Sequence, residues 1–278
     1  MALFFTSLAS GSNGNCYYIG NEREAVLVDA GITCREVERR MERLGLQPQK
    51  LKAIFVSHEH SDHIRGLNLI SKKYNLPVYI TPETYRFCPV PVERHLVKNF
   101  VAFEPITVGQ LVIKAFPKLH DASDAHSFVI SGGGVTVGVF TDIGAPCKNV
   151  VQYFSQCHAA ILESNFDDGM LDAGHYPIFL KNRIRGGKGH LSNRQALQLF
   201  QTHRPEFMSH LILGHLSKEN NCPNLVGNMF AEHAGETHIT VASRYNETPV
   251  YTITSSQPSF ENFSSVQVAE PPRQMSLF

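Results

Sequence analysis

Short apolar runs separated by turn residues fill the first part of the chain. Three of these runs predict a meander of strands, at residues 3–9, 16–19 and 25–28. A helix is predicted over 33–44, because Thr33 can cap its start and Gly45 can end it. Asp29 directly follows the third run, so a carboxylate lies at the end of a predicted buried strand.

The rest of the chain alternates apolar runs with helical periodicity, and polar residues repeatedly follow the strand ends. Further strands are predicted at 51–57, 77–80, 111–117, 127–131, 135–140, 159–162, 211–213 and 238–242. Helices are predicted at 64–74, 146–155, 175–185, 193–203 and 223–233, with an insertion at 81–105. The pattern predicts an α/β fold, an αββα sandwich in which two mixed sheets pack face to face with helices outside.

Composition limits the classes of protein that fit. The 278 residues contain 25 Lys and Arg and 25 Asp and Glu, so any polyanion must bind to a local basic patch. No apolar run is long enough to cross a membrane and no signal peptide is evident, which predicts a cytoplasmic protein without a membrane partner. The six cysteines form no CxxC pair and are expected to be buried thiols. We expect one domain over 1–254 and a disordered Ser/Pro-rich tail over 255–278, and the pattern leaves the oligomeric state open.

The chemistry concentrates in one run, His58-Glu59-His60-Ser61-Asp62-His63, between a predicted strand and a predicted helix. Open α/β sheets bind ligands at such strand ends. A divalent ion needs several donors within about 2.0–2.2 Å, and imidazoles crowded with carboxylates supply them. His58 and His60 alternate and can point the same way, whereas Asp62 and His63 can face a second ion. A purely structural role does not account for four such donors in six residues.

Taken together with this run, single donors at other strand ends make the chain resemble the metallo-β-lactamase fold over residues 3 to 253. Within that superfamily it is most similar to the YycJ/WalJ group, near the RNase Z and RNase J nucleases. The segments that carry the resemblance are 7–16, 58–63, 120–122, 141–142, 163–165, 189–193 and 215–221.

The resemblance implies a site for two metal ions. One ion would be held by His58, His60 and His120, a second by Asp62, His63 and His215, with Asp142 bridging both. Asp29 would orient a ligand histidine. His126 is the rival of His120, which is favoured because it follows the strand end and matches the motif. The expected cofactors are two divalent ions, Zn or Mn, since mixed imidazole and carboxylate donors suit both.

Two such ions about 3.5–4 Å apart can activate water and clamp a phosphate. Besides the ligand Asp62, the residues expected to serve catalysis are His190 and Glu163. By the same resemblance His190 would protonate the leaving alkoxide, and Glu163 could pair with it and favour its protonated form. Helix capping or packing is the structural alternative for His190.

Five cations without an intervening acid flank His190, at residues 181, 183, 185, 188 and 194. Such a run is usually a solvated face, but beside a metal site it can bind a phosphate backbone. Lys188, Arg194, Ser217, Lys218 and Asn220 are the expected substrate contacts. Gln274-Met275-Ser276-Leu277-Phe278 resembles the peptide with which bacterial replication and repair proteins dock on the DNA sliding clamp, through Gln274, Leu277 and Phe278.

These features favour a dinuclear-metal phosphodiesterase. The resemblance implies a 5′-to-3′ DNA exonuclease that serves repair, such as mismatch excision, and the C-terminal peptide adds the DNA polymerase III sliding clamp to DNA as an expected partner. The alternatives are an RNA-processing nuclease of the RNase Z/J type and a small-ester hydrolase similar to glyoxalase II, which would not need the basic patch. A clamp-binding adaptor with a vestigial site fits poorly, because the ligand set looks complete.

Overall fold

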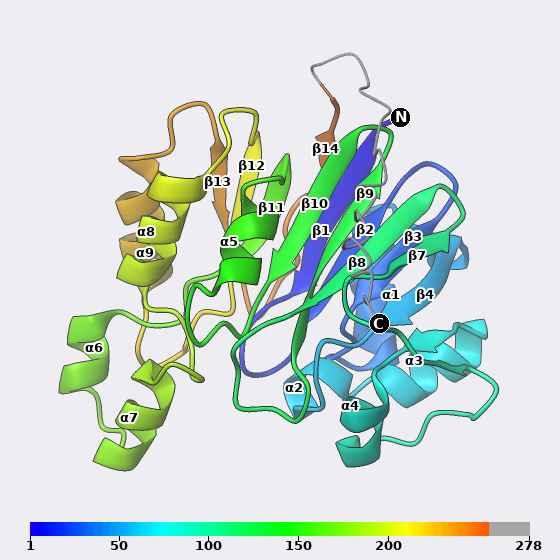
Figure 1. Cartoon of the computed structure of the whole chain (residues 1–278), viewed down its shortest axis with the longest axis horizontal. Coiled ribbons are helices and arrows are strands. Elements are labelled where there is room, and N and C mark those ends of the chain that lie inside the picture. Colours follow the sequence, from blue (N-terminus) through cyan, green and yellow to red (C-terminus); the bar gives the residue numbers. More distant parts are fainter. Residues whose placement is uncertain (256–278) are drawn as a thin grey trace, which may run out of the picture.

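Two seven-stranded mixed β-sheets pack face to face in the computed structural model, which describes residues 1–255 (Figure 1). In spatial order, the first sheet comprises β14 (Tyr251–Ile253), β1 (Leu3–Ala9), β2 (Cys16–Gly20), β3 (Ala25–Val28), β4 (Leu51–Phe55), β5 (Val78–Tyr79) and β6 (Val97–Lys98). The second comprises β13 (His238–Val241), β12 (His210–Gly214), β11 (Ala159–Glu163), β10 (Val135–Phe140), β9 (His126–Gly132), β8 (Leu111–Pro117) and β7 (Pro105–Val108). The predicted architecture of two mixed sheets is confirmed.

Helices cover the outer face of each sheet. The helices are α1 (Cys34–Arg43), α2 (Ser61–Ile64), α3 (Leu67–Tyr74), α4 (Pro82–Phe87), α5 (Lys148–Phe154), α6 (Asp168–Ala173), α7 (Ile178–Arg185), α8 (Asn193–His203) and α9 (Pro223–Ala231), with a 3₁₀ turn at Pro48–Lys50. Apolar residues of α1, α3 and α4 pack on the first sheet, and those of α5, α8 and α9 pack on the second. The short helices α2, α4, α6 and α7 lie toward the lower edge of the sandwich in Figure 1.

The central strands are apolar throughout because both of their faces are buried. In β3, Val26 and Val28 point into the layer between the sheets, and Ala25 and Leu27 point toward the helices. Successive side chains of a strand alternate between its faces, so one continuous apolar run supplies two cores. This explains why the sequence shows apolar runs here in place of strict alternation.

The predicted helix over 64–74 is two helices, α2 and α3, and the prediction of a single helix was wrong. Gly66 separates them, and its backbone N–H donates to the Ala30 carbonyl over 2.8 Å. A Cβ at Gly66 would lie 2.0 Å from the Ile32 carbonyl oxygen, and one at Gly31 would lie 1.7 Å from that of Asp62. The loop after β3 therefore packs directly against the histidine run, which only glycine permits at these two positions.

Several predicted elements differ from the structure in extent. The strand predicted at 51–57 ends at Phe55, and the helix predicted at 175–185 begins at Ile178. The insertion at 81–105 contains α4 and β6, and β7, α6 and β14 were not predicted. By contrast, Thr33 caps α1 as predicted, and Ser192 caps α8 at the predicted start of that helix.

The carboxyl ends of the strands that precede the polar residues meet at one edge of the sandwich. β3 and β4 are parallel in the first sheet, and β10, β11 and β12 are parallel in the second. β8 runs in the same direction as β10, because each is antiparallel to β9. Among residues 1–255 no helix is long and apolar enough to span a membrane. The predicted tail and its clamp-binding peptide lie outside the described residues, apart from Ser255.

Candidate metal centre and active site

Three of the site residues, which follow the ends of strands, have a left-handed backbone conformation. Asp29 has φ 62°, Asp142 has φ 54° and His215 has φ 54°. This region costs a residue with a Cβ about 1–2 kcal/mol. Such strain concentrates where side chains must be aimed at a functional site. The turns bring carboxylates and imidazoles from both sheets to the shared edge.

A first cluster joins three histidines from the two sheets. One ring nitrogen each from His58, His60 and His120 lies within 4.8 Å of the other two. Nδ1 of His58 is 2.9 Å from the Ser57 hydroxyl, and Nδ1 of His120 donates to the Gly189 carbonyl over 3.1 Å. These contacts leave Nε2 of both rings available to the cluster, where Nε2 of His58 lies 3.1 Å from Nδ1 of His60.

A second cluster is formed by Asp62, His63 and His215. His63 Nδ1 donates to Asp29 Oδ2 over 2.7 Å, and His215 Nδ1 donates to Glu163 Oε1 over 2.9 Å. Nε2 of the two rings lies 3.5 Å and 3.6 Å from Asp62 Oδ2. Each imidazole is therefore turned by a buried carboxylate so that its other nitrogen faces Asp62, the arrangement that metal-binding histidines adopt.

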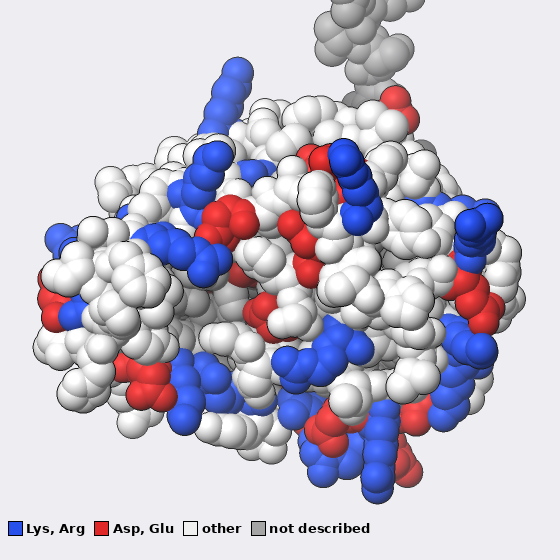
Figure 2. All heavy atoms as spheres, turned by 90° about the horizontal axis from the view of Figure 1, so that it is seen from below, with Lys and Arg blue, Asp and Glu red and all other residues white. Residues whose placement is uncertain are grey.

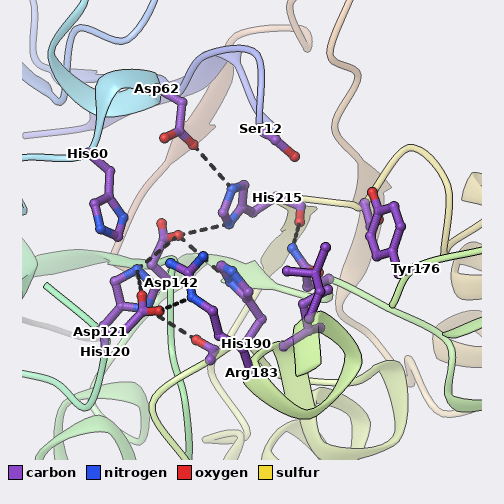
Figure 3. Close-up of a pocket in the computed structure, with 15 residues that line it drawn as sticks. Ser12, His60, Asp62, His120, Asp121, Asp142, Tyr176, Arg183, His190 and His215 are labelled. Atoms are coloured by element: carbon purple, nitrogen blue, oxygen red, sulfur yellow. Dashed lines mark hydrogen bonds and ion pairs between the residues drawn. The ribbon is translucent and has the colours of Figure 1, made fainter. Parts of the chain in front are cut away.

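Asp142 lies between the two clusters. Its Oδ2 is 3.0 Å from His63 Nε2, and its Oδ1 is 3.7 Å from His120 Nε2 and 3.2 Å from His215 Nδ1. Figure 3 shows its carboxylate in the middle of the site, facing His120 on one side and His215 on the other. One carboxylate can therefore contact the ligands of both clusters.

The residues present fit two divalent ions. Within residues 1–255, His120 Nε2 and Asp142 Oδ2 are buried and make no hydrogen bond, although the latter approaches His63 closely. Buried polar atoms are rarely left without a partner, and metal coordination would satisfy both. Burial would lower the pKa of His215, but Asp142, Asp62 and Glu163 raise it to about 10. The carboxylates thus favour positive charge at this position, which a divalent cation would supply.

Glu163 connects the metal clusters to His190. Its Oε1 accepts hydrogen bonds from His190 Nδ1 over 2.7 Å and from His215 Nδ1. Its Oε2 accepts from the backbone N–H groups of Ile143 and Leu191, over 2.7 Å and 3.2 Å. Burial would raise the pKa of Glu163, but the two imidazoles lower it to about 2. The predicted pairing of Glu163 with His190 is present, and its second bond, to His215, was not predicted.

The clusters open into a pocket of about 250 Å³ at the strand ends (Figure 3). Besides cluster residues and His190, its polar lining includes Ser12, Asp121, Asn165, Tyr176, Arg183 and Ser217. Seen from this edge, the surface carries acidic side chains near its centre and Lys and Arg side chains around them (Figure 2). A substrate that reaches the clusters therefore passes a rim of mixed charge.

The predicted substrate contacts differ in where they lie. Ser217 lines the pocket, whereas Lys188, Arg194, Lys218 and Asn220 are absent from its lining within the described chain. The Arg194 side chain is 75% exposed and pairs with an acid of α6, and the Lys218 side chain is 65% exposed. Asn220 is buried, and its Nδ2 lies 3.4 Å from the Ser217 hydroxyl. Contact of these four residues with substrate remains a prediction.

Arg183 is the cation of the predicted basic run that lines the pocket. Its Nε donates to Asp121 Oδ2 over 2.5 Å, and the other Asp121 oxygen lies 3.5 Å from His120 Nε2. Arg183 is one of the five cations noted in the sequence, but it was not among the expected substrate contacts. Asp121 was also not predicted to line the pocket, although its position directly after His120 in the motif could have indicated it. His126 lies outside the clusters, with its ring edge-on to Phe100.

Residues 9–156 match the family model of the metallo-β-lactamase superfamily. The chain belongs to this superfamily. Exodeoxyribonuclease YycJ of Bacillus anthracis is 32% identical over 233 residues, which cover 81% of this chain and 86% of the relative. Exodeoxyribonuclease WalJ of Streptococcus pneumoniae is 29% identical over 228 residues, covering 80% and 84%. With its His and Asp clusters, this member of the superfamily is a metal-dependent hydrolase.

Solved structures of the superfamily share the fold over nearly the whole described chain. YhfI of Bacillus subtilis superposes with a TM-score of 0.69 at 18% identity, covering 90% of this chain and 99% of that one. The short form of human tRNase Z gives 0.61 at 16% identity, covering 88% and 98%. At these identities the comparison shows the fold, and the predicted metallo-β-lactamase fold is confirmed.

Proposed function

We propose that the protein is a dinuclear-metal phosphodiesterase that acts as an exodeoxyribonuclease. The observation that carries the proposal is the position of Asp142 between two clusters of imidazoles and carboxylates. The relatives named exodeoxyribonuclease supply the substrate class, because they match about four fifths of the chain. The substrate would thus be DNA.

In this proposal His58, His60 and His120 would hold one ion, Asp62, His63 and His215 would hold the other, and Asp142 would serve as a ligand shared by the two. When bound, the two ions would supply an activated water and neutralise charge on the phosphate. Asp29 keeps His63 turned toward its cluster through the 2.7 Å bond to Nδ1.

The groups that would act on the phosphodiester lie around the clusters. The leaving alkoxide needs a proton, and His190 lines the pocket with Nδ1 bonded to Glu163, so the doubly protonated ring would donate the proton on Nε2. Arg183 and Ser217 lie in the same pocket, where a guanidinium and a hydroxyl can bind phosphate oxygens. Both therefore supply contacts for the nucleotide that carries the scissile bond.

Direction and biological role form a finer part of the proposal. The likeness to the YycJ/WalJ group supports 5′-to-3′ digestion and a role in repair such as mismatch excision. The peptide Gln274-Met275-Ser276-Leu277-Phe278 supports docking on the DNA sliding clamp, since an apolar Leu-Phe anchor fits a groove and raises the local concentration of enzyme on DNA.

End-labelled oligonucleotides test the proposal directly. Purified protein with Mn²⁺ or Zn²⁺ should shorten 5′-labelled DNA from its labelled end, and His60→Ala should abolish this reaction. His95→Ala is the matched control, because the His95 side chain is 64% exposed and lies outside the clusters. Digestion of RNA alone would favour an RNA-processing nuclease, and hydrolysis of small esters without either nucleic acid would favour a glyoxalase II-like enzyme.

A further inference from the structure

Helix α7 lies beside the pocket with an unusual side-chain distribution. Within the described chain none of the eight residues of this helix is buried, and Ile178 and Phe179 are 75% and 74% exposed. Two other apolar residues of the same helix, Leu180 and Ile184, line the pocket. Large apolar side chains exposed beside a site usually contact a ligand or a partner.

Aromatic side chains lie both in the pocket wall and on the exposed surface beside it. Tyr176 lines the pocket on the side opposite His60 (Figure 3) and lies three residues before Phe179. The pocket wall next to the clusters thus includes Tyr176 and Leu180, and Phe179 lies between these two residues in the sequence with its side chain exposed.

The charge of the same element complements a phosphate backbone. Helix α7 carries Lys181, Arg183 and Arg185 and no acid. Asp121 pairs with Arg183 and Asp172 pairs with Arg185, which leaves the helix with a surplus of positive charge. Aromatic rings interleaved with cations are the feature by which proteins hold single-stranded nucleic acid, because bases stack on the rings and the cations follow the phosphates.

We propose that Tyr176 and Phe179 form a stacking platform for unpaired bases of the DNA strand next to the scissile phosphate. This inference rests on the proposed exodeoxyribonuclease function and adds a binding site to it. The helix is tied to the reaction site, since the Ile184 carbonyl accepts the backbone N–H of His190 over 2.8 Å. Bases stacked on the platform therefore set the position of the phosphate relative to His190.

The test compares binding and hydrolysis by Phe179→Ala and by Phe207→Ala. Phe207 is a matched control because it is 46% exposed and lies just before the start of β12, at the opposite end from His215. The probes are single-stranded oligonucleotides with normal bases or with abasic sites at the terminal nucleotides. Binding is measured on metal-loaded protein by fluorescence anisotropy with phosphorothioate versions, and kcat and KM are measured with phosphodiester versions.

Phe179→Ala should raise Kd and KM for the normal strand about 10-fold, within the range for loss of one stacked base, and change those for the abasic strand much less. Tyr176→Leu should act in the same direction, and Phe207→Ala should match wild type on both strands. If Phe179→Ala and Tyr176→Leu bind the normal strand as wild type does while DNA is still hydrolysed, the platform is wrong and the proposed function stands. Equal weakening on both strands would also refute stacking, and would indicate that this surface contacts only the sugar-phosphate backbone. If wild type neither binds nor hydrolyses DNA, both proposals fail.

Discussion

Replacing Glu163 by glutamine tests whether this carboxylate sets the tautomers of two histidines. Its four accepted hydrogen bonds, from His190, His215 and two backbone N–H groups, leave no place for an amide donor. If the glutamine NH₂ faces the backbone, the buried N–H groups of Ile143 and Leu191 lose their acceptor and cannot become acceptors themselves, which costs about 1–3 kcal/mol each. With the NH₂ turned toward the rings, both imidazoles can respond by moving their proton to Nε2.

The orientation with the NH₂ toward the rings is therefore favoured, and it would affect metal binding and catalysis. His215 would carry a proton on Nε2, the atom 3.6 Å from Asp62 and available to a metal ion. Loss of such an orienting partner costs about 10–100-fold in metal affinity or activity. For His190, an amide N–H that faces Nδ1 fits only a neutral ring, and because a neutral imidazole is a weak proton donor, this adds a loss of about 10²–10⁴-fold in kcat. We expect Glu163→Gln to lower both the metal affinity and kcat, while KM for DNA changes little.

Calorimetric titration with Mn²⁺ measures the affinity, and hydrolysis of labelled DNA at saturating metal measures kcat. Glu93→Gln is the control, since the Glu93 side chain is 41% exposed and pairs with Lys72 at the surface. A protein with Glu163→Gln that keeps wild-type kcat and metal affinity would refute the argument, because the buried amide would then have imposed no change on either ring.

Four further changes have defined outcomes. Asp142→Ala should lose bound metal and hydrolysis together in metal analysis and rate assays, and normal metal content with full activity would rule out a shared ligand. His190→Ala should keep its metal but lower kcat about 10²–10⁴-fold, whereas an unchanged rate would remove its role as proton donor. Arg183→Ala should raise KM for DNA about 10-fold and reduce the salt dependence of KM, and unaltered salt dependence would exclude phosphate contact. Deletion of 274–278 should abolish binding to immobilised sliding clamp and spare hydrolysis of free oligonucleotides, so unchanged clamp affinity would contradict the docking proposal.

Local patterns predicted those elements whose ends are set by local contacts. Helix α8 begins at the predicted residue because the Ser192 side chain accepts from the Gln195 backbone N–H and the Gln195 side chain accepts from the Ser192 backbone N–H. Strand β14 was not predicted because its order comes from pairing with β1, in which Leu3 lies opposite Ile253 at the other end of the described chain. The break between α2 and α3 depends on Gly66 packing against the loop after β3, which no local periodicity reveals.

The site shows the same division between local and distant information. The histidine run was evident from its spacing, whereas choosing His120 over His126 required the motif as a whole. The sequence could not select Arg183 from its neighbouring cations, since only the fold decides which of them faces the pocket. The bond from Glu163 to His215 joins two strand ends 52 residues apart, and its existence depends on the parallel pairing of β11 with β12.

Metal content measured together with hydrolysis shows whether the two clusters hold the ions on which hydrolysis would depend. Wild-type protein, His60→Ala and His215→Ala would each be loaded with Mn²⁺, freed of excess ion, and assayed for bound metal and for hydrolysis of labelled DNA. We expect about two ions per chain in wild type, loss of about one ion in each variant, and loss of hydrolysis in both variants. Full hydrolysis by chelator-treated wild type, or by variants that have lost an ion, would contradict this expectation.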